Sequence, residues 1–154
     1  MLFRSARNLG LGLDTVEKAL TSESGLKGMS GLATGDIRDL NEAAAKGNAD
    51  ARIALDMFAN QIRRFIGQFL VRMNGADVLI FTAGIGENNP DLRAAVCANL
   101  DFCGLELDPG LNAATRATET VISKPSSKIE VRVIPTNEEL VIARNAWAKL
   151  QESH

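Results

Sequence analysis

The clearest periodic pattern along the chain predicts one long helix. Between residues 49 and 74, apolar side chains recur at steps of three and four residues, which is the spacing of one face of an α-helix. The pattern stops at Gly75, and the arginines of the segment fall largely off the apolar stripe: Arg63, Arg64 and Arg72. We therefore expect a core helix over about 49–74 with one solvated face.

Two shorter helices are predicted ahead of the long one. Asp14 is a candidate N-cap that Glu17 would complete as a capping box, giving a helix to about residue 21. A second helix is expected over about 36–46, with Gly47 just beyond its end. The residues between these two helices include four glycines and four hydroxyl side chains, which predicts irregular backbone there.

The second half of the chain alternates predicted strands and helices. Residues 77–82 form an apolar run without alternation, which is typical of a strand buried on both faces. Further strands are expected over 120–123 and 129–134, and a last helix over about 138–150. Twice, then, a buried strand leads through a short segment into a helix. This order predicts an α/β fold with a mixed sheet flanked by helices, in a single domain over 1–154.

Composition excludes several classes of protein. The chain is 45% hydrophobic and 23% charged, with a formal net charge of −2, which is ordinary for a globular domain and favours neither nucleic acid nor membrane as partner. No apolar run approaches the ~18 residues of a membrane span, and the start of the chain does not resemble a signal peptide. Two cysteines, Cys97 and Cys103, are typical of reduced thiols in a cytoplasmic protein.

The scarcity of histidine limits the chemistry that the chain can perform. The only histidine is His154, at the C-terminus. Catalytic dyads that pair histidine with serine or cysteine are thereby excluded, as are metal sites built from several histidines. Catalysis would have to use carboxylates, arginines, backbone amides or a bound metal ion.

The segment Gly84–Asn88 is the best local candidate for a binding site. Ligands of open α/β sheets bind at the carboxyl ends of strands. Glycines there let a ligand approach the backbone, and a helix begins next, with Asn89 as cap and Pro90 as its first residue. The pattern is neither a dinucleotide fingerprint nor a P-loop. A nucleotide or phosphate site and a tight strand-to-helix turn are both compatible with it.

Three charged residues outside this segment are candidate site residues, and each also has a purely structural explanation. Glu138, in the first turn of the last helix, could hold Mg²⁺, whereas its neighbours Thr136 and Glu139 form a capping-box pattern that needs no function. Asp36 and Arg38 fit a helix cap with an ion pair.

Arg93 lies one turn into the helix that begins at Pro90. It could reach a phosphate group through two hydrogen bonds, or pair with Asp91 or Glu87.

Three separate stretches resemble the acetate kinases, in the same order along the chain. They are PheThrAlaGlyIleGlyGluAsn over 81–88, ValIleProThrAsnGluGluLeuValIleAlaArg over 133–144, and SerGlyLeuLysGlyMetSerGly over 24–31 followed by AspIleArgAspLeu over 36–40. The resemblance extends from about residue 9 to about residue 150. Residues 1–8 match the family poorly.

The resemblance implies a fold, a reaction and a set of site residues. Acetate kinases transfer the γ-phosphoryl group of ATP to acetate, giving acetyl phosphate and ADP, on a duplicated actin-like ATPase (ribonuclease H-like) fold. The chain would correspond to part of the C-terminal domain. Glu138 would be associated with Mg²⁺, and the family would form homodimers. Nucleotide-binding residues would be Asp36, Ile37, Arg38, Gly84, Ile85, Gly86, Glu87, Asn88 and Arg93.

The resemblance is confined to the C-terminal portion of the family, and this changes the expected activity. The family's catalytic residues fall outside the match, so we assign no catalytic residue to this chain and expect weak nucleotide binding at best, without turnover. The 77–82 strand would keep an unpaired apolar edge. A propionate or butyrate kinase is an alternative within the same class. A module that binds adenine nucleotide or a partner chain without catalysis is the alternative outside it.

Overall fold

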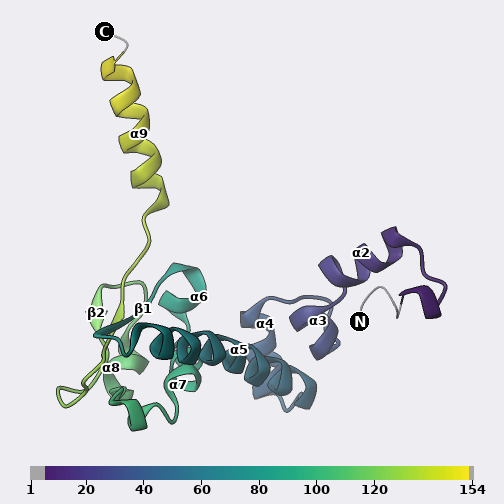
Figure 1. The fold of residues 1–154 in the computed structure, drawn as a ribbon, viewed down its shortest axis with the longest axis horizontal. Coiled ribbons are helices and arrows are strands. Elements are labelled where there is room, and N and C mark those ends of the chain that lie inside the picture. Colours follow the sequence, from purple (N-terminus) through teal and green to yellow (C-terminus); the bar gives the residue numbers. More distant parts are fainter. Residues whose placement is uncertain (1–5, 153–154) are drawn as a thin grey trace. The chain divides into compact units, whose positions relative to one another are not determined.

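The computed structural model describes residues 6–152, with the side chains of residues 138 and 152 left outside the description (Figure 1). The chain divides into two compact units, Met1–Ile66 and Gly67–His154. The division falls inside the long helix α5 (Ala49–Met73). A single domain over 1–154 stays a prediction.

The first unit is helical, and its helices begin and end partly as predicted. Helix α2 (Leu13–Ser22) begins after Gly12 without a side-chain cap, so the predicted capping box of Asp14 and Glu17 is wrong. The expected irregular segment contains a further helix, α3 (Gly25–Ser30). Helix α4 (Ile37–Ala45) is confirmed, with Asp36 as its cap.

Helix α5 has the predicted length but not the predicted burial. Its buried positions are alanines: Ala51, Ala54 and Ala59. Most of its large apolar side chains are exposed: Ile53, Met57, Phe65, Phe69, Val71 and Met73. The prediction of a core helix is therefore wrong for most of the stripe, because periodicity identifies an apolar face without supplying the groups that would cover it.

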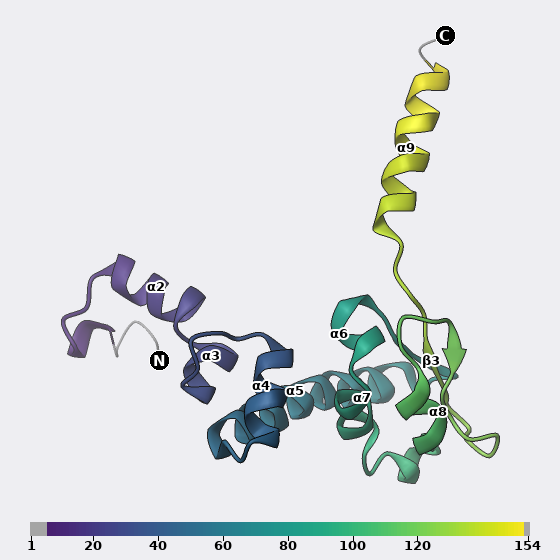
Figure 2. The same ribbon diagram turned by 180° about the vertical axis from the view of Figure 1, so that it is seen from behind.

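The second unit is built on a sheet of three short strands, β1 (Val78–Phe81), β2 (Thr120–Val121) and β3 (Glu130–Val133). Their order is β1-β3-β2. Strand β1 pairs in parallel with β3, with Val78 opposite Glu130 and Phe81 opposite Val133, and β2 is antiparallel to β3. Strands β1 and β3 are seen in Figures 1 and 2.

Strand β1 lies at an edge of this sheet, as expected. Val131 and Val133 on β3 are fully buried, and so is Ile122, which follows β2. On β1, Phe81 is buried, whereas Val78 is 43% exposed and Ile80 is 50% exposed. The prediction that this strand is buried on both faces is therefore wrong, because one face of β1 has no covering layer in the part of the chain that the structure describes.

Besides the end of α5, the second unit contains five described helical segments, and two of them were predicted. Helix α7 (Pro90–Cys97) begins as expected with Asn89 as cap, and α9 (Glu138–Glu152) closes the chain. Three helical segments were not predicted: α6 (Ala83–Asn88), the 3₁₀ turn η1 (Asp101–Cys103) and α8 (Pro109–Ala114). Helices α7 and α8 contact one another, and α7 contributes Leu92 and Val96 to the core.

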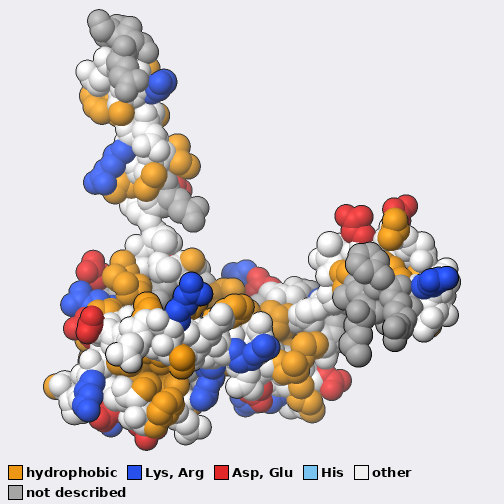
Figure 3. Space-filling view, in the orientation of Figure 1, with side chains coloured by type: hydrophobic (Ala, Val, Ile, Leu, Met, Phe, Trp, Pro, Cys, Tyr) orange, Lys and Arg blue, Asp and Glu red, His pale blue; other side chains and the backbone are white. Residues whose placement is uncertain are grey.

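Helix α9 presents apolar side chains to solvent. Every position that the structure describes from 139 to 151 is exposed, and Figure 3 shows hydrophobic side chains on the visible face of this helix. The large ones are Leu140, Val141, Ile142, Trp147 and Leu150. Within the described residues, no helix has the length and apolar character needed to cross a membrane.

Two isoleucines of the second unit give a matched test of where the core lies. Ile122 is fully buried, and Ile80 is half exposed. Replacing a buried isoleucine by alanine costs about 2–5 kcal/mol because a cavity remains, so we expect that loss for Ile122→Ala and under about 1 kcal/mol for Ile80→Ala. Urea unfolding followed by circular dichroism measures both, and equal losses would contradict the assigned core.

Candidate functional site

The predicted site residues of the second unit gather where the parallel strands of the sheet have their carboxyl ends, and this end of the sheet is the edge meant below. Helix α6 follows β1, and the segment 134–137 follows β3 and leads into α9. Because β1 and β3 are parallel neighbours, their carboxyl ends meet at the same edge. The backbone N–H of Ile134 donates to the carbonyl of Phe81 at 2.9 Å, which extends the pairing of the two strands to this edge.

The glycine segment is a short helix rather than an open turn, and its two glycines differ. The left-handed backbone at the junction falls on Ala83, with φ of +60°. A side chain at Gly86 would lie 3.4 Å from the backbone of Phe81, which is at the limit of ordinary van der Waals contact. A side chain at Gly84 would meet nothing within 4 Å. The described structure therefore gives no conformational or packing reason for glycine at position 84.

Arg93 is the best-buried side chain of this region. It has no exposed surface, and all five of its N–H groups donate to protein oxygens at 2.8–2.9 Å. The acceptors are the Asn112 amide oxygen and the backbone carbonyls of Gly86, Glu87, Asn112 and Thr115. Asn112 is held in turn, since its amide nitrogen donates to the carbonyl of Pro90 at 2.9 Å. Arg93 thus joins α6, α7 and α8.

This arrangement matches neither local alternative for Arg93, a phosphate contact or an ion pair with Asp91 or Glu87, and its place among the nucleotide-binding residues stays a prediction. Its N–H donors are all engaged, and Glu87 receives a hydrogen bond from it through the backbone carbonyl rather than the carboxylate. Burial lowers the pKa of the Arg93 guanidinium from its ordinary value, and repulsion by Arg116 lowers that pKa further. Arg93 does lie beside the glycine segment, where it fixes the backbone of Gly86 and Glu87.

Glu87 connects the glycine segment to the start of α9. The residue is 7% exposed, and its carboxylate accepts two hydrogen bonds through Oε1, from the backbone N–H of Thr136 at 2.8 Å and from the Thr136 hydroxyl at 3.0 Å. The predicted capping box of Thr136 and Glu139 is therefore wrong. Asn137 caps the helix instead, because its Oδ1 accepts from the backbone N–H of Leu140 at 2.9 Å.

The remaining residues of the glycine segment are closer to solvent. The side-chain amide of Asn88 donates to the carbonyl of Gly84 at 3.1 Å. Ile85 is 45% exposed. Of the predicted residues in this segment, Gly84, Ile85 and Asn88 are exposed and lie outside the internal network around Arg93 and Glu87.

Asp36, Ile37 and Arg38 belong to the first unit and form a compact turn there. Asp36 Oδ1 accepts from the Arg38 backbone N–H at 2.8 Å, and the Arg38 guanidinium donates to both carboxylate oxygens, at 3.1 and 2.7 Å. These bonds from Arg38 lower the pKa of Asp36 from 3.8 to about 2. Ile37 is buried. The cap and the ion pair are both present, and a nucleotide contact by this turn stays a prediction.

The predicted magnesium residue cannot be placed, since the side chain of Glu138 lies outside the description. Among the described side chains, no three carboxylate, thiol or imidazole groups come together as they would around a metal ion. Glu87, the buried carboxylate of this edge, already accepts two hydrogen bonds. The described residues therefore do not by themselves fit a Mg²⁺ site.

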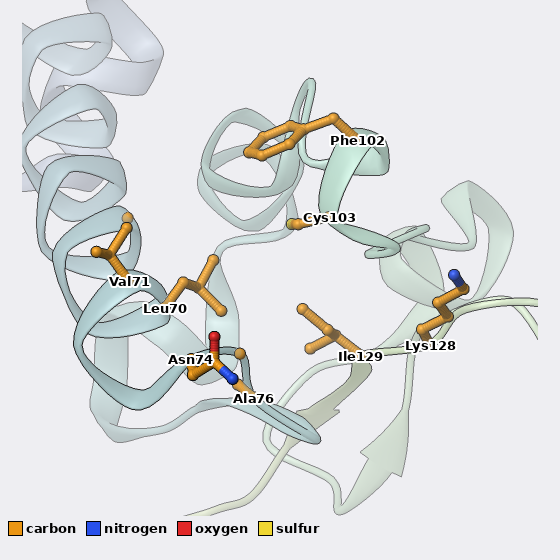
Figure 4. A pocket seen from close by; sticks show the side chains of 10 residues that line it. Leu70, Val71, Asn74, Ala76, Phe102, Cys103, Lys128 and Ile129 are labelled. Atoms are coloured by element: carbon orange, nitrogen blue, oxygen red, sulfur yellow. The ribbon is translucent and has the colours of Figure 1, made fainter.

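A cavity of about 540 Å³ lies elsewhere in the second unit (Figure 4). Asn74 and Ala76, which precede β1, contribute to its lining, as does Ile129, which precedes β3. Leu70 and Ile129 extend into it from different elements. The cavity is thus at the amino ends of the parallel strands, and none of the predicted site residues lines it.

Sequence reasoning missed the residues that hold the glycine segment in place. Asn112 and Thr115 belong to α8 and its end, a helix that was not predicted. A local signal for it was available, because Asp108 precedes Pro109 in the pattern of an N-cap followed by proline, and Asp108 does accept from the Leu111 backbone N–H. No local signal indicates that oxygens of Asn112 and Thr115 accept hydrogen bonds from Arg93.

Comparison with known proteins gives one consistent result. The model of the acetokinase family matches residues 1–144. The acetate kinase of Leifsonia xyli subsp. xyli is 46% identical over 146 residues, covering 95% of this chain and 36% of that protein. The acetate kinase of Geobacillus kaustophilus is 50% identical over 136 residues, covering 88% of this chain and 34% of that protein.

Solved structures agree with these relatives. The acetate kinase of Porphyromonas gingivalis has a TM-score of 0.88 and 36% identity, covering 97% of this chain and 37% of its own. A propionate kinase from Francisella tularensis has a TM-score of 0.79 and 34% identity, covering 90% and 34%. The α/β fold class predicted from sequence is confirmed. The chain spans about a third of the length of the relatives it matches.

The contact between Arg38 and Asp36 predicts a low titration midpoint. The Asp36 carboxyl should titrate near pH 2 rather than 3.8, as followed by carbon NMR of that group. Arg38→Ala should raise the midpoint without reaching 3.8, because the backbone N–H still donates. With the pKa lowered on folding, this carboxylate stabilises the fold above pH 3.8, and the effect is lost as the pH falls through about 2. An unchanged midpoint in Arg38→Ala would refute this account.

The hydrogen bonds of Arg93 predict a large loss of stability on a conservative substitution. Lysine has three donors on a flexible stem and cannot reproduce the planar fork, so Arg93→Lys leaves buried acceptors unpaired at about 1–3 kcal/mol each. We expect Arg93→Lys to lower the free energy of unfolding by at least ~3 kcal/mol. Arg116→Lys, at an exposed position, should cost under ~1 kcal/mol. Urea unfolding measures the free energy of unfolding of both variants, and similar losses of stability would contradict the assigned role of Arg93.

Proposed function

Because the chain belongs to the acetokinase family, we propose that it supplies the nucleotide side of an acetate kinase. In that reaction an acetate oxygen bonds to the γ-phosphorus of ATP while the bond between that phosphorus and ADP breaks, giving acetyl phosphate and ADP. The glycine segment 84–88 and the turn 36–38 would contact the nucleotide. Homodimer formation and a cytoplasmic location belong to the same proposal.

The observation that best supports a ligand at this edge is the open space over Gly84. Gly84 lies in the first turn of α6, and nothing lies within 4 Å of the position its side chain would take, so a ligand can reach the backbone there. A ligand that must approach the backbone closely gives glycine a purpose there. The position, at the carboxyl end of β1, is where α/β sheets bind ligands.

The described residues also support the proposal that this chain does not turn over alone. Phosphoryl transfer depends on groups that neutralise charge on the moving phosphoryl group. Arg93 has no N–H donor left for that role, and Arg38 is bonded to Asp36 through two nitrogens. The chain spans about a third of its relatives, so the missing positive charges would come from polypeptide outside it.

Magnesium would reach this site mainly through the nucleotide. Mg²⁺ in phosphate-binding sites keeps several waters and takes one or two carboxylates together with substrate phosphates. The described residues offer no complete set of ligands, and Glu138 is the one carboxylate we propose for this role, by family resemblance alone.

A propionate kinase is the second candidate, and one observation favours it. A propionate kinase from Francisella tularensis is structurally similar over 90% of this chain. Both candidates share the nucleotide side, so one binding experiment tests what they have in common.

Gly84 and Gly67 provide a matched pair for that experiment. Both glycines are helical and neither has an atom within 4 Å of an added side chain, so Gly84→Leu and Gly67→Leu should both fold. Calorimetric titration with Mg-ADP and Mg-ATP should show weak, saturable binding that Gly84→Leu reduces at least ~10-fold, a loss of about 1.4 kcal/mol. Gly67→Leu should bind as the unmodified chain does.

Two results would contradict the proposed site. Nucleotide binding that survives Gly84→Leu unchanged would place the nucleotide elsewhere on the chain. A folded, unmodified chain that gives no heat up to millimolar nucleotide would show that these segments bind no nucleotide by themselves, and the alternative of an independent nucleotide-binding module would fall with it.

A further inference from the structure

The buried carboxylate of Glu87 has a role that the nucleotide proposal does not explain. It lies within the segment expected to contact nucleotide, yet it is 7% exposed. Its Oε1 accepts both the backbone N–H and the hydroxyl of Thr136, at 2.8 and 3.0 Å. The two residues are 49 positions apart in the chain. Glu87 is therefore bonded to the protein through Oε1.

A buried carboxylate is an energetically unfavourable choice for a residue that only fills space. Burying a carboxylate costs free energy that hydrogen bonds must offset, and the ion pairs between described side chains do not include Glu87. Its two donors come from a single residue. Two hydrogen bonds from one residue fix both the backbone and the side chain of that residue, which gives directional control that apolar packing does not supply.

Each end of the contact is tied to a different part of the site. On one side, the carbonyl of Glu87 accepts from Arg93, so the residue is fixed to the network that joins α6, α7 and α8. On the other side, Thr136 is followed by Asn137, which caps α9 through the N–H of Leu140. The first residue of α9 is Glu138. The contact thus connects the glycine segment to the point where α9 begins.

We infer that Glu87 is a positioning residue, which fixes the start of α9 relative to the glycine segment and transmits ligand binding at the glycine segment to residues 136–140. The second half of this inference rests on the proposed function, since it needs a nucleotide at residues 84–88. The first half is a property of the chain alone. Glu87 would then act on the reaction only through the placement of Glu138 and its neighbours, without touching the nucleotide.

The first test needs no nucleotide. Backbone amide order parameters from nitrogen NMR relaxation should be about 0.85 at residues 136, 137 and 140 of the unmodified chain, as in β3, and fall below about 0.6 in Glu87→Ala. Glu87→Gln retains an oxygen acceptor at the same place, so it should preserve the order of these residues. Thr136→Val removes only the hydroxyl donor and should give an intermediate loss.

A core variant separates positioning from general destabilisation. Val96 is fully buried on α7, so Val96→Ala should weaken the unit while leaving the order parameters at 136, 137 and 140 unchanged. The inference is overturned if Val96→Ala loosens these residues as much as Glu87→Ala does. It is also overturned if Glu87→Gln is no better than Glu87→Ala, or if Glu87→Ala leaves the three residues ordered. Should Glu87→Ala not fold, Thr136→Val gives the same comparison.

The second test adds ADP and distinguishes this inference from the proposed function. Hydrogen exchange should slow by several-fold at amides of both 84–88 and 136–140 in the unmodified chain and in Glu87→Gln. In Thr136→Val the slowing at 136–140 should be reduced, while that at 84–88 remains. Slowing confined to 84–88 in the unmodified chain would overturn the transmission. No slowing at any residue would instead count against the proposed nucleotide site, and the first test would still decide the role of Glu87.

Discussion

The burial of one positive charge determines the arrangement of the candidate site. The Arg93 guanidinium has no exposed surface, and each of its five N–H groups meets an oxygen of the protein. A buried charge is tolerated only when hydrogen bonds replace the water that it loses. Helices α6, α7 and α8 must therefore keep the one mutual placement in which these acceptors surround Arg93. The position of the glycine segment after β1 follows from that requirement.

The same requirement separates the residues of the site into two groups. Arg93, Glu87 and the backbone of Gly86 are committed to holding the protein together, although the family resemblance places them all in the nucleotide region. Gly84 and Ile85 remain accessible. In the proposed site, nucleotide recognition would then fall to the backbone, the apolar surface of Ile85 and the amide of Asn88, with the charged side chains acting behind them. Such a division is common where a ligand needs a precisely held backbone.

Local signals predicted several local features, although the capping box of Asp14 and Glu17 is absent, and they predicted long-range features poorly. The long helix over 49–74, the cap at Asp36 and the cap at Asn89 each depend on a few neighbouring residues, and all were predicted. Exposure of α5 and β1 was not, because a pattern shows which face is apolar and not whether another segment covers it. For Arg93 the sequence indicated only a phosphate group or the nearby carboxylates of Asp91 and Glu87, because its actual partners Asn112 and Thr115 lie 19 and 22 residues further along. Thr136 was assigned to a capping box for the same reason, since its acceptor is 49 residues away.

The most direct test of this account is an NMR observation of the Arg93 guanidinium itself, in the free chain and with ADP added. If all five N–H groups of Arg93 are bonded to protein oxygens, its Nε–H and Nη–H signals should be separately resolved. They should also exchange slowly with water and stay unchanged when ADP binds. Averaged, rapidly exchanging signals would show that the guanidinium is not held by five acceptors. Signals that shift strongly with ADP would show that Arg93 is a phosphate ligand, and the division of the site into holding and binding residues would be wrong.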